Sequence, residues 1–150
     1  MRTILFALAA LAACGDRSAP SGDARADPRD AARVALGEKV YAAHCASCHG
    51  ARLEGQPTWQ QRLPNGRMPA PPHDESGHTW HHPDSVLFGI TKHGLVPPYA
   101  PPAYQSDMPA FAGKLSDEEI WAVLAYIKNH WKSPDVLAAR AEMIRNMEKR

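Results

Sequence analysis

The sequence predicts an all-α protein with three to four helices joined by long, Pro-rich loops. Signals for the start of a helix recur along the chain, and no segment has the apolar–polar alternation of a strand. Much of the chain's fourteen prolines lies between Pro57 and Pro109. Because proline disrupts helices, this middle region is expected to be extended. At 150 residues the chain has room for one domain plus targeting and linker segments.

The N-terminal region reads as an export signal. The apolar run Ile4–Ala13 is too short to span a membrane, which takes about 20 residues, but it fits the hydrophobic part of a signal peptide. It ends in Leu-Ala-Ala-Cys, which resembles a bacterial lipobox and implies a signal peptide at 1–13 with a lipid on Cys14. The alternative is an ordinary cleaved signal with an incidental cysteine. The polar segment 14–27 is expected to be a flexible linker.

Two helices are expected in the first part of the domain. Asp27 reads as an N-cap with Pro28 at the first helical position, which predicts a helix to about Ala43. A second helix is predicted over Pro83–His93 and closed by Gly94.

The last two helices have clear start signals. Ser116-Asp117-Glu118-Glu119 forms a capping box, with Leu115 and Ile120 as a hydrophobic staple, and predicts a helix to about Trp131. Ser133-Pro134 begins a final helix. We expect Leu137, Ala141 and Ile144 of that helix to pack on the domain, and Arg140, Arg145 and Lys149 to stay in solvent. The predicted domain therefore spans 28–132, with a C-terminal helical extension at 133–150.

The segment Cys45-Ala46-Ser47-Cys48-His49 carries the most chemical information. A Cys-x-x-Cys pair alone could be a redox dithiol, half of a zinc site or a disulfide. The adjacent His49 makes it an attachment signal for haem c, because two thiols on one turn can reach the two vinyl groups of a porphyrin. The histidine is then placed as an axial iron ligand. The chain has three cysteines, so no thiol remains for a structural disulfide.

Met108 is the first candidate for the sixth iron ligand. It lies in Asp107-Met108-Pro109-Ala110-Phe111, just before the last domain helix, where the proline restricts the backbone. Met68, which also precedes a proline, is the rival candidate.

These motifs resemble class I, mono-haem cytochromes c over roughly Ala31 to Trp131. The shared features are C-A-S-C-H near the start, M-P-A-F late, and a closing helix of the L-S-D-E-E-I-W-A-V-L-A-Y-I type. The resemblance implies the cytochrome c fold around one covalently attached haem. It also implies that the first and last helices cross, with Gly37 and Tyr41 meeting Val123 and Tyr126.

The resemblance implies two further roles near the haem. Trp80 would donate its indole N–H to a haem propionate; the alternative is a core tryptophan bonded to a backbone carbonyl. A proline carbonyl would accept the second ring N–H of His49. Pro57 is the first candidate for that acceptor, with Pro69 behind it.

The middle region is unusually rich in histidine for this family. One of these histidines could displace Met108, several could hold copper or zinc, or all could be surface and loop residues. They are His73, His78, His81, His82 and His93.

The expected function is electron transfer by a membrane-tethered cytochrome in a periplasmic respiratory chain. Its partners would be redox proteins such as a terminal oxidase or an upstream reductase. With Lys+Arg 17 against Asp+Glu 16, the chain has no overall field to hold nucleic acid. No catalytic constellation is evident, which favours a carrier over an enzyme. The alternatives are a haem enzyme or gas or redox sensor with a displaceable distal ligand, and a thiol oxidoreductase using Cys45 and Cys48.

Overall fold

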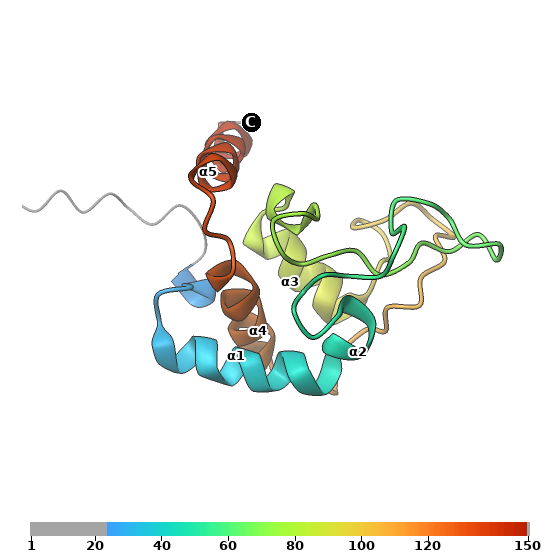
Figure 1. Ribbon diagram of the computed structural model, residues 1–150, viewed down its shortest axis with the longest axis horizontal. Coiled ribbons are helices and arrows are strands. Elements are labelled where there is room, and N and C mark those ends of the chain that lie inside the picture. The colour runs from blue at the N-terminus through green and yellow to red at the C-terminus, as the bar shows by residue number, and fades with distance from the viewer. Residues whose placement is uncertain (1–23, 150) are drawn as a thin grey trace, which may run out of the picture.

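The computed structural model describes residues 24–149 and is built from helices (Figure 1). The only β-type pairing in this range is an isolated bridge between Ala112 and Leu115, so the all-α class is confirmed. The elements are η1 (Ala24–Ala26), α1 (Ala31–His44), α2 (Ala46–His49), η2 (Thr79–His81), α3 (Asp84–His93), α4 (Asp117–Asn129) and α5 (Pro134–Glu148).

The predicted signal peptide, 1–13, and Cys14 lie outside the described residues, as does most of the predicted linker, 14–27. The last part of that linker is packed rather than free. Ala26 of η1 is fully buried, and the Arg25 guanidinium lies 4.2 Å from the centroid of the Trp121 ring. Within residues 24–149, no helix combines the length and the apolar character needed to cross a membrane.

The first long helix begins later than the sequence predicted. Asp30, not Asp27, is its N-cap, and the Asp30 carboxylate accepts from the backbone N–H of Arg33 at 3.1 Å. Asp27 is occupied by Arg29, which donates to it from both its backbone and its side chain. The prediction failed because either aspartate suits a cap by type, and a local contact at Asp27 decided between them.

Helices α1 and α4 cross at Gly37, as the resemblance implied. A Cβ on Gly37 would lie 2.0 Å from the carbonyl oxygen of Ala122 and 2.8 Å from Cβ of Tyr126. Only glycine allows this approach of two backbones. One turn further along α1, the Tyr41 and Tyr126 rings lie 5.3 Å apart between their centroids.

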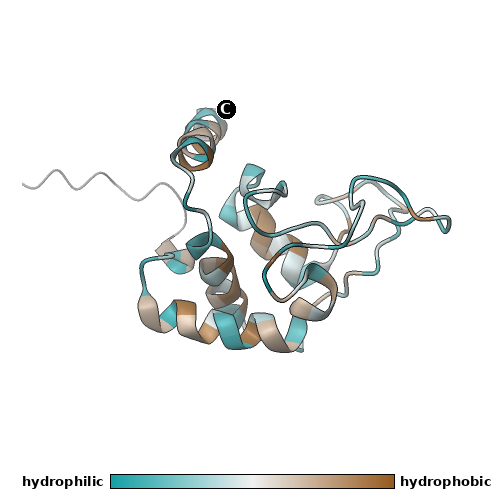
Figure 2. Ribbon diagram, viewed as in Figure 1, coloured by the Kyte–Doolittle hydropathy of each residue, from teal (hydrophilic) through white to brown (hydrophobic). Residues whose placement is uncertain are grey.

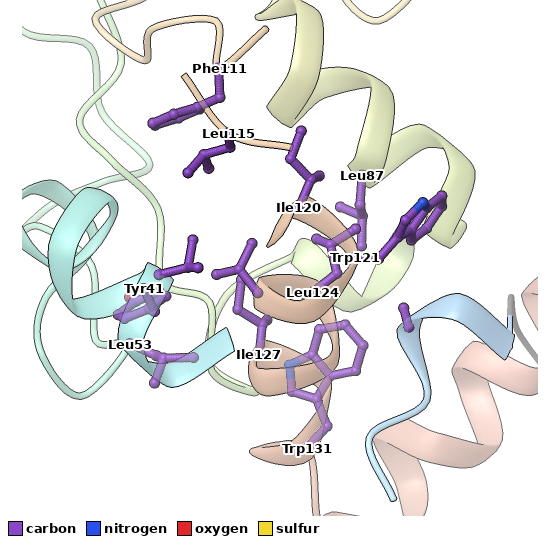
Figure 3. Packing of buried hydrophobic residues seen from close by; sticks show 13 residues of the cluster. Tyr41, Leu53, Leu87, Phe111, Leu115, Ile120, Trp121, Leu124, Ile127 and Trp131 are labelled. Carbon is purple, nitrogen blue, oxygen red and sulfur yellow. The ribbon is translucent and has the colours of Figure 1, made fainter. Parts of the chain in front are cut away.

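Helix α4 forms the centre of the core. Its buried residues run almost without interruption from Ile120 to Lys128, and Figure 2 shows hydrophobic residues along this helix. Figure 3 shows Ile120, Leu124 and Ile127 pointing among side chains from α1, α3 and the loops. The predicted capping box is present, since Ser116 and Glu119 each bond the other's backbone N–H. The helix ends at Asn129, two residues before the expected Trp131.

Two long loops extend from the helical body, before η2 and after α3 (Figure 1). They are joined by an ion pair between Arg67 and Asp107. The second loop is also anchored to α3, because Gly89 leaves room for the Tyr99 ring: a Cβ on Gly89 would meet that ring at 2.0 Å. Helix α3 spans Asp84–His93 and ends at Gly94, in line with the prediction.

The C-terminal extension forms α5, capped by Ser133 as predicted, but its packing face differs from the prediction. Ile144 is buried, whereas Leu137 is 46% exposed and Arg140 is only 4% exposed. The expectation that Arg140 stays in solvent was therefore wrong. The cause is Asp84, a buried carboxylate that pairs with the Arg140 guanidinium and makes its burial tolerable.

Candidate functional site

The first cysteine, Cys45, caps the short helix α2, and the second, Cys48, lies within it. Cys45 ends α1 and caps α2, and its carbonyl oxygen accepts from the backbone N–H groups of Cys48 and His49 at 3.1 and 2.9 Å. Both thiols are free, with Cys45 half-buried and Cys48 exposed. The Tyr41 hydroxyl, from the α1–α4 crossing, donates to the Gly50 carbonyl at 2.9 Å. The turn that presents both sulfurs is thus fixed to the core.

His49 is buried, and one of its two ring nitrogens is occupied. Nδ1 lies 2.8 Å from the carbonyl oxygen of Pro71, which can only accept, so Nδ1 carries the proton. Burial lowers the pKa of His49, while the bond to Pro71 opposes that shift. A neutral imidazole results, with the lone pair on Nε2 available to a metal.

The acceptor for His49 is therefore Pro71 rather than the predicted Pro57 or Pro69. Pro57 lies exposed in the first long loop. The prediction failed because the acceptor is a backbone carbonyl, which every residue has. Only the path of the loop determines which carbonyl reaches the ring, and the proline-rich run offers several.

His73 lies directly against His49, a contact that the sequence did not reveal. The two rings stack with centroids 3.9 Å apart and an interplanar angle of 23°. His73 Nδ1 lies 2.9 Å from the Thr79 hydroxyl, which itself lies 3.3 Å from the Pro72 carbonyl. Burial lowers the pKa of His73 well below its usual value. The stacked His73 ring supports the orientation of the His49 imidazole.

Trp80, in η2, carries one of the two buried side-chain polar atoms without a hydrogen-bond partner among residues 24–149; the other is Nε of Arg33. Its indole Nε1 is inaccessible to solvent and has no hydrogen-bond partner among the described residues. A buried N–H without an acceptor costs about 1–3 kcal/mol, so such atoms are rare in native proteins. The Trp131 indole, by contrast, donates to the His73 carbonyl at 3.0 Å. An acceptor from outside residues 24–149, such as a propionate, would fit the Trp80 N–H.

Met108 is placed at the end of the second long loop. It is partly buried and packs against the hydrophobic core, whereas Met68 is not among the side chains that do so. The residues after it are tied to the end of α3: the N–H groups of Phe111 and Ala112 donate to the carbonyls of Thr91 and Lys92 at 3.1 and 2.8 Å. The structure therefore favours Met108 over Met68 as a side chain held at the core.

The remaining histidines do not gather into a metal centre. Within residues 24–149, no group of three or more histidine, cysteine or acidic side chains is arranged to hold a metal ion. His78 instead stacks on Trp59, with centroids 5.5 Å apart, and lies 5.5 Å from the His82 ring. These aromatic contacts stabilise the first long loop against η2.

The Cys45 thiol differs from the reactive thiol of a thiol oxidoreductase. Burial raises the pKa of the Cys45 thiol to about 11, with a contribution from Cys48. Reactive dithiol centres need the opposite, a thiolate stabilised near neutral pH. A Cys45 thiol that stays protonated is a poor nucleophile for thiol–disulfide exchange.

Comparison with known proteins agrees with this geometry. The family model described as cytochrome c matches residues 34–131, from the first turn of α1 to just beyond α4. No curated protein and no solved structure matches the chain. The matched range includes Cys45, Cys48, His49, Trp80 and Met108 and excludes α5.

Proposed function

The chain belongs to the cytochrome c family, and on that premise we propose that it is a membrane-tethered, mono-haem electron carrier. Its all-α fold is the cytochrome c fold, and the family's members are haem proteins that transfer electrons. In this proposal, Cys45 and Cys48 form thioethers with one haem c, and His49 and Met108 ligate its iron.

The protonation state of the buried His49 ring is the observation that carries the proposal. Its Nδ1 proton is bound by Pro71, its pKa is lowered by burial, and Nε2 is left with a lone pair. An unshared buried imidazole nitrogen next to two free thiols is the donor set that haem c requires. When bound, haem c supplies a one-electron iron couple. The chain fixes the axial imidazole and, through Trp80, offers an N–H to a propionate.

Met108 determines what kind of carrier this would be. A thioether sulfur favours Fe(II) and raises the reduction potential. The hydrogen bonds between the segment after Met108 and α3 support the position of this side chain against the core. Such a site suits delivery of electrons to a high-potential acceptor, for which a terminal oxidase is the proposed type and an upstream reductase the proposed donor.

The proposed location is the cell envelope, facing the periplasm or another extracytoplasmic space. Support comes from the sequence alone: an export signal at 1–13, Cys14 in a lipobox-like context, and a polar linker. We expect the wild type to fractionate with membranes and the Cys14→Ser variant, exported behind an ordinary signal peptide, to be released as a soluble protein. An unchanged membrane association in the variant would contradict the tether.

The ligand set is tested by reduced and oxidised absorption spectra of the wild type, Met108→Ala and Met68→Ala. The wild type should show a haem c spectrum and, when oxidised, the weak sulfur-to-iron band near the red end. Met108→Ala should lose that band and bind CO when reduced, while Met68→Ala should match the wild type. Loss of the band in Met68→Ala alone would overturn the assignment. A wild type that binds CO readily would favour the sensor or enzyme alternative.

A further inference from the structure

Arg140 joins the C-terminal extension to the segment that contains Trp80. Its Nη1 donates to the backbone carbonyls of Trp80 and His82, at 2.7 and 2.6 Å, and its Nη2 donates to the Asp84 carboxylate. A single guanidinium thus bridges three residues that are far from it in sequence. Such a fork is available to arginine and not to lysine, whose ammonium is a single point.

The charges around Arg140 are buried together. Asp84 also accepts from Lys128 of α4 at 2.5 Å, and the side chains of Arg140, Lys128 and Asp84 are 5%, 8% and 2% exposed. Two cations share one carboxylate, so this buried triad has a formal charge of +1. The Arg140 guanidinium also lies 5.0 Å from the Trp131 ring centroid. The Arg140 guanidinium is therefore held by contacts with η2, with α3 and with Trp131, which follows α4.

Trp80, whose backbone Arg140 binds, also has an indole N–H without an acceptor among residues 24–149. The Trp80 carbonyl is bound by Arg140, while the indole Nε1 of the same residue is buried without a partner among residues 24–149. In the proposed function, that N–H faces a haem propionate. The clamped carbonyl and the indole belong to one residue, so the clamp fixes the backbone from which the indole projects.

We infer that α5 is part of the haem site, with Arg140 as a positioning residue that fixes the Trp80 indole toward a propionate. This inference rests on the proposed function and extends it to a helix outside the family match, which ends at residue 131. In this inference Arg140 acts through its hydrogen bond to the Trp80 carbonyl.

The reduction potential is the property that this arrangement controls. A propionate bound by an N–H has part of its negative charge offset, and an unpaired propionate stabilises the oxidised, more positive haem. Misplacing the Trp80 indole should therefore lower the potential. Loss of the buried positive charge acts in the same direction, because a buried charge is weakly screened.

The test is a double-mutant cycle on the purified, haem-loaded chain, with the midpoint potential as the readout. The variants are Arg140→Gln, Trp80→Phe and the double variant, with Arg145→Gln as the matched control. Arg145 lies on the same helix but is exposed, so its substitution removes the same charge without a buried contact. Arg140→Gln should lower the potential, Arg145→Gln should leave it unchanged, and Arg140→Gln should have a smaller effect in the Trp80→Phe background.

Arg140→Lys keeps the inference testable if Arg140→Gln fails to mature. It retains the charge but cannot reach both carbonyls and the carboxylate together, so we expect a lowered potential with wild-type helicity. A potential equal to the wild type in Arg140→Lys, or an equal shift by Arg140→Gln with and without Trp80, overturns the inference. Failure of the proposed function looks different, since the wild type itself would then lack haem or the Met108 spectrum.

Discussion

The α1–α4 crossing and the attachment of α5 join helices by opposite means. At the crossing, Gly37 brings the backbones of α1 and α4 into contact, and the Tyr41 and Tyr126 rings pack against each other one turn further along α1. At α5, the contact depends on the buried charges of Arg140, Asp84 and Lys128. The first junction lies within the family match and the second lies beyond it.

The two junctions should lose stability in response to different kinds of substitution. A close-packed apolar junction is sensitive to added volume, whereas a buried ion network is sensitive to the loss of one partner. Helix α5 also stands apart from the other helices, at one end of the molecule (Figure 1). A helix with so little apolar attachment depends strongly on its few polar contacts.

The largest effect is expected from Asp84→Ala. Removing this carboxylate leaves Lys128 and Arg140 buried with no anion between them, which should cost about 3–5 kcal/mol of unfolding free energy. Chemical denaturation measures the loss. Asp117→Ala is the control, because Asp117 pairs with Lys92 while its side chain is 60% exposed, and we expect it to cost less than about 1 kcal/mol. Equal losses of unfolding free energy in both variants would show that the buried triad does not stabilise the attachment of α5.

Gly37→Ala tests the crossing itself. Helix propensity alone predicts that alanine stabilises α1 by about 1 kcal/mol. The contact predicts the reverse, since the new Cβ would meet the Ala122 carbonyl at 2.0 Å, and we expect a net loss of about 1–3 kcal/mol. Ala35→Gly, at an exposed position of the same helix, isolates the propensity effect. A more stable Gly37→Ala protein would contradict the close approach.

Helix caps should matter more at α4 than at α5. Ser116 and Glu119 form a reciprocal capping box, whereas Ser133 accepts from Val136 at the longer distance of 3.5 Å. We expect Ser116→Ala to cost about 1 kcal/mol and Ser133→Ala about half of that. Thermal unfolding of the two variants, followed by circular dichroism, provides the comparison. The reverse order would indicate that α5 begins more firmly than its geometry suggests.

The smallest effect is expected from acid titration of Asp27. Hydrogen bonds from the Arg29 side chain and backbone lower the pKa of Asp27 to about 2. A folded-state pKa below the unfolded value means that the ionised form stabilises the fold, and that this stability is lost as pH falls from about 4 toward 2. Asp27→Asn should therefore unfold at a lower temperature than the wild type at pH 5, and most of this difference should disappear by pH 2. A difference in unfolding temperature that is as large at pH 2 as at pH 5 would contradict the ionic origin.

The parts of the fold that depend on local signals were predictable from the sequence. The capping box at Ser116 and the stop at Gly94 both involve contacts within a few residues, which determine a helix end wherever it packs. The C-x-x-C-H segment is equally local, and the structure places its two thiols and His49 on one turn.

The parts that the sequence did not reveal depend on contacts between distant residues. Arg140 was expected in solvent because an arginine on a helix is usually solvent-exposed. Only the ion pair with Asp84, on α3, makes its burial tolerable. The choice of Pro71 over Pro57 and the stacking of His73 on His49 likewise follow from the path of one loop. No residue type within that loop signals the outcome.

The central claim is that one haem is attached through Cys45 and Cys48. Intact mass measurement of the exported chain, after treatment with an alkylating reagent under denaturing conditions, tests it most directly. The account predicts a chain heavier by one haem, with neither of these two thiols alkylated. A colourless chain without the added mass, with both Cys45 and Cys48 alkylated, would contradict it.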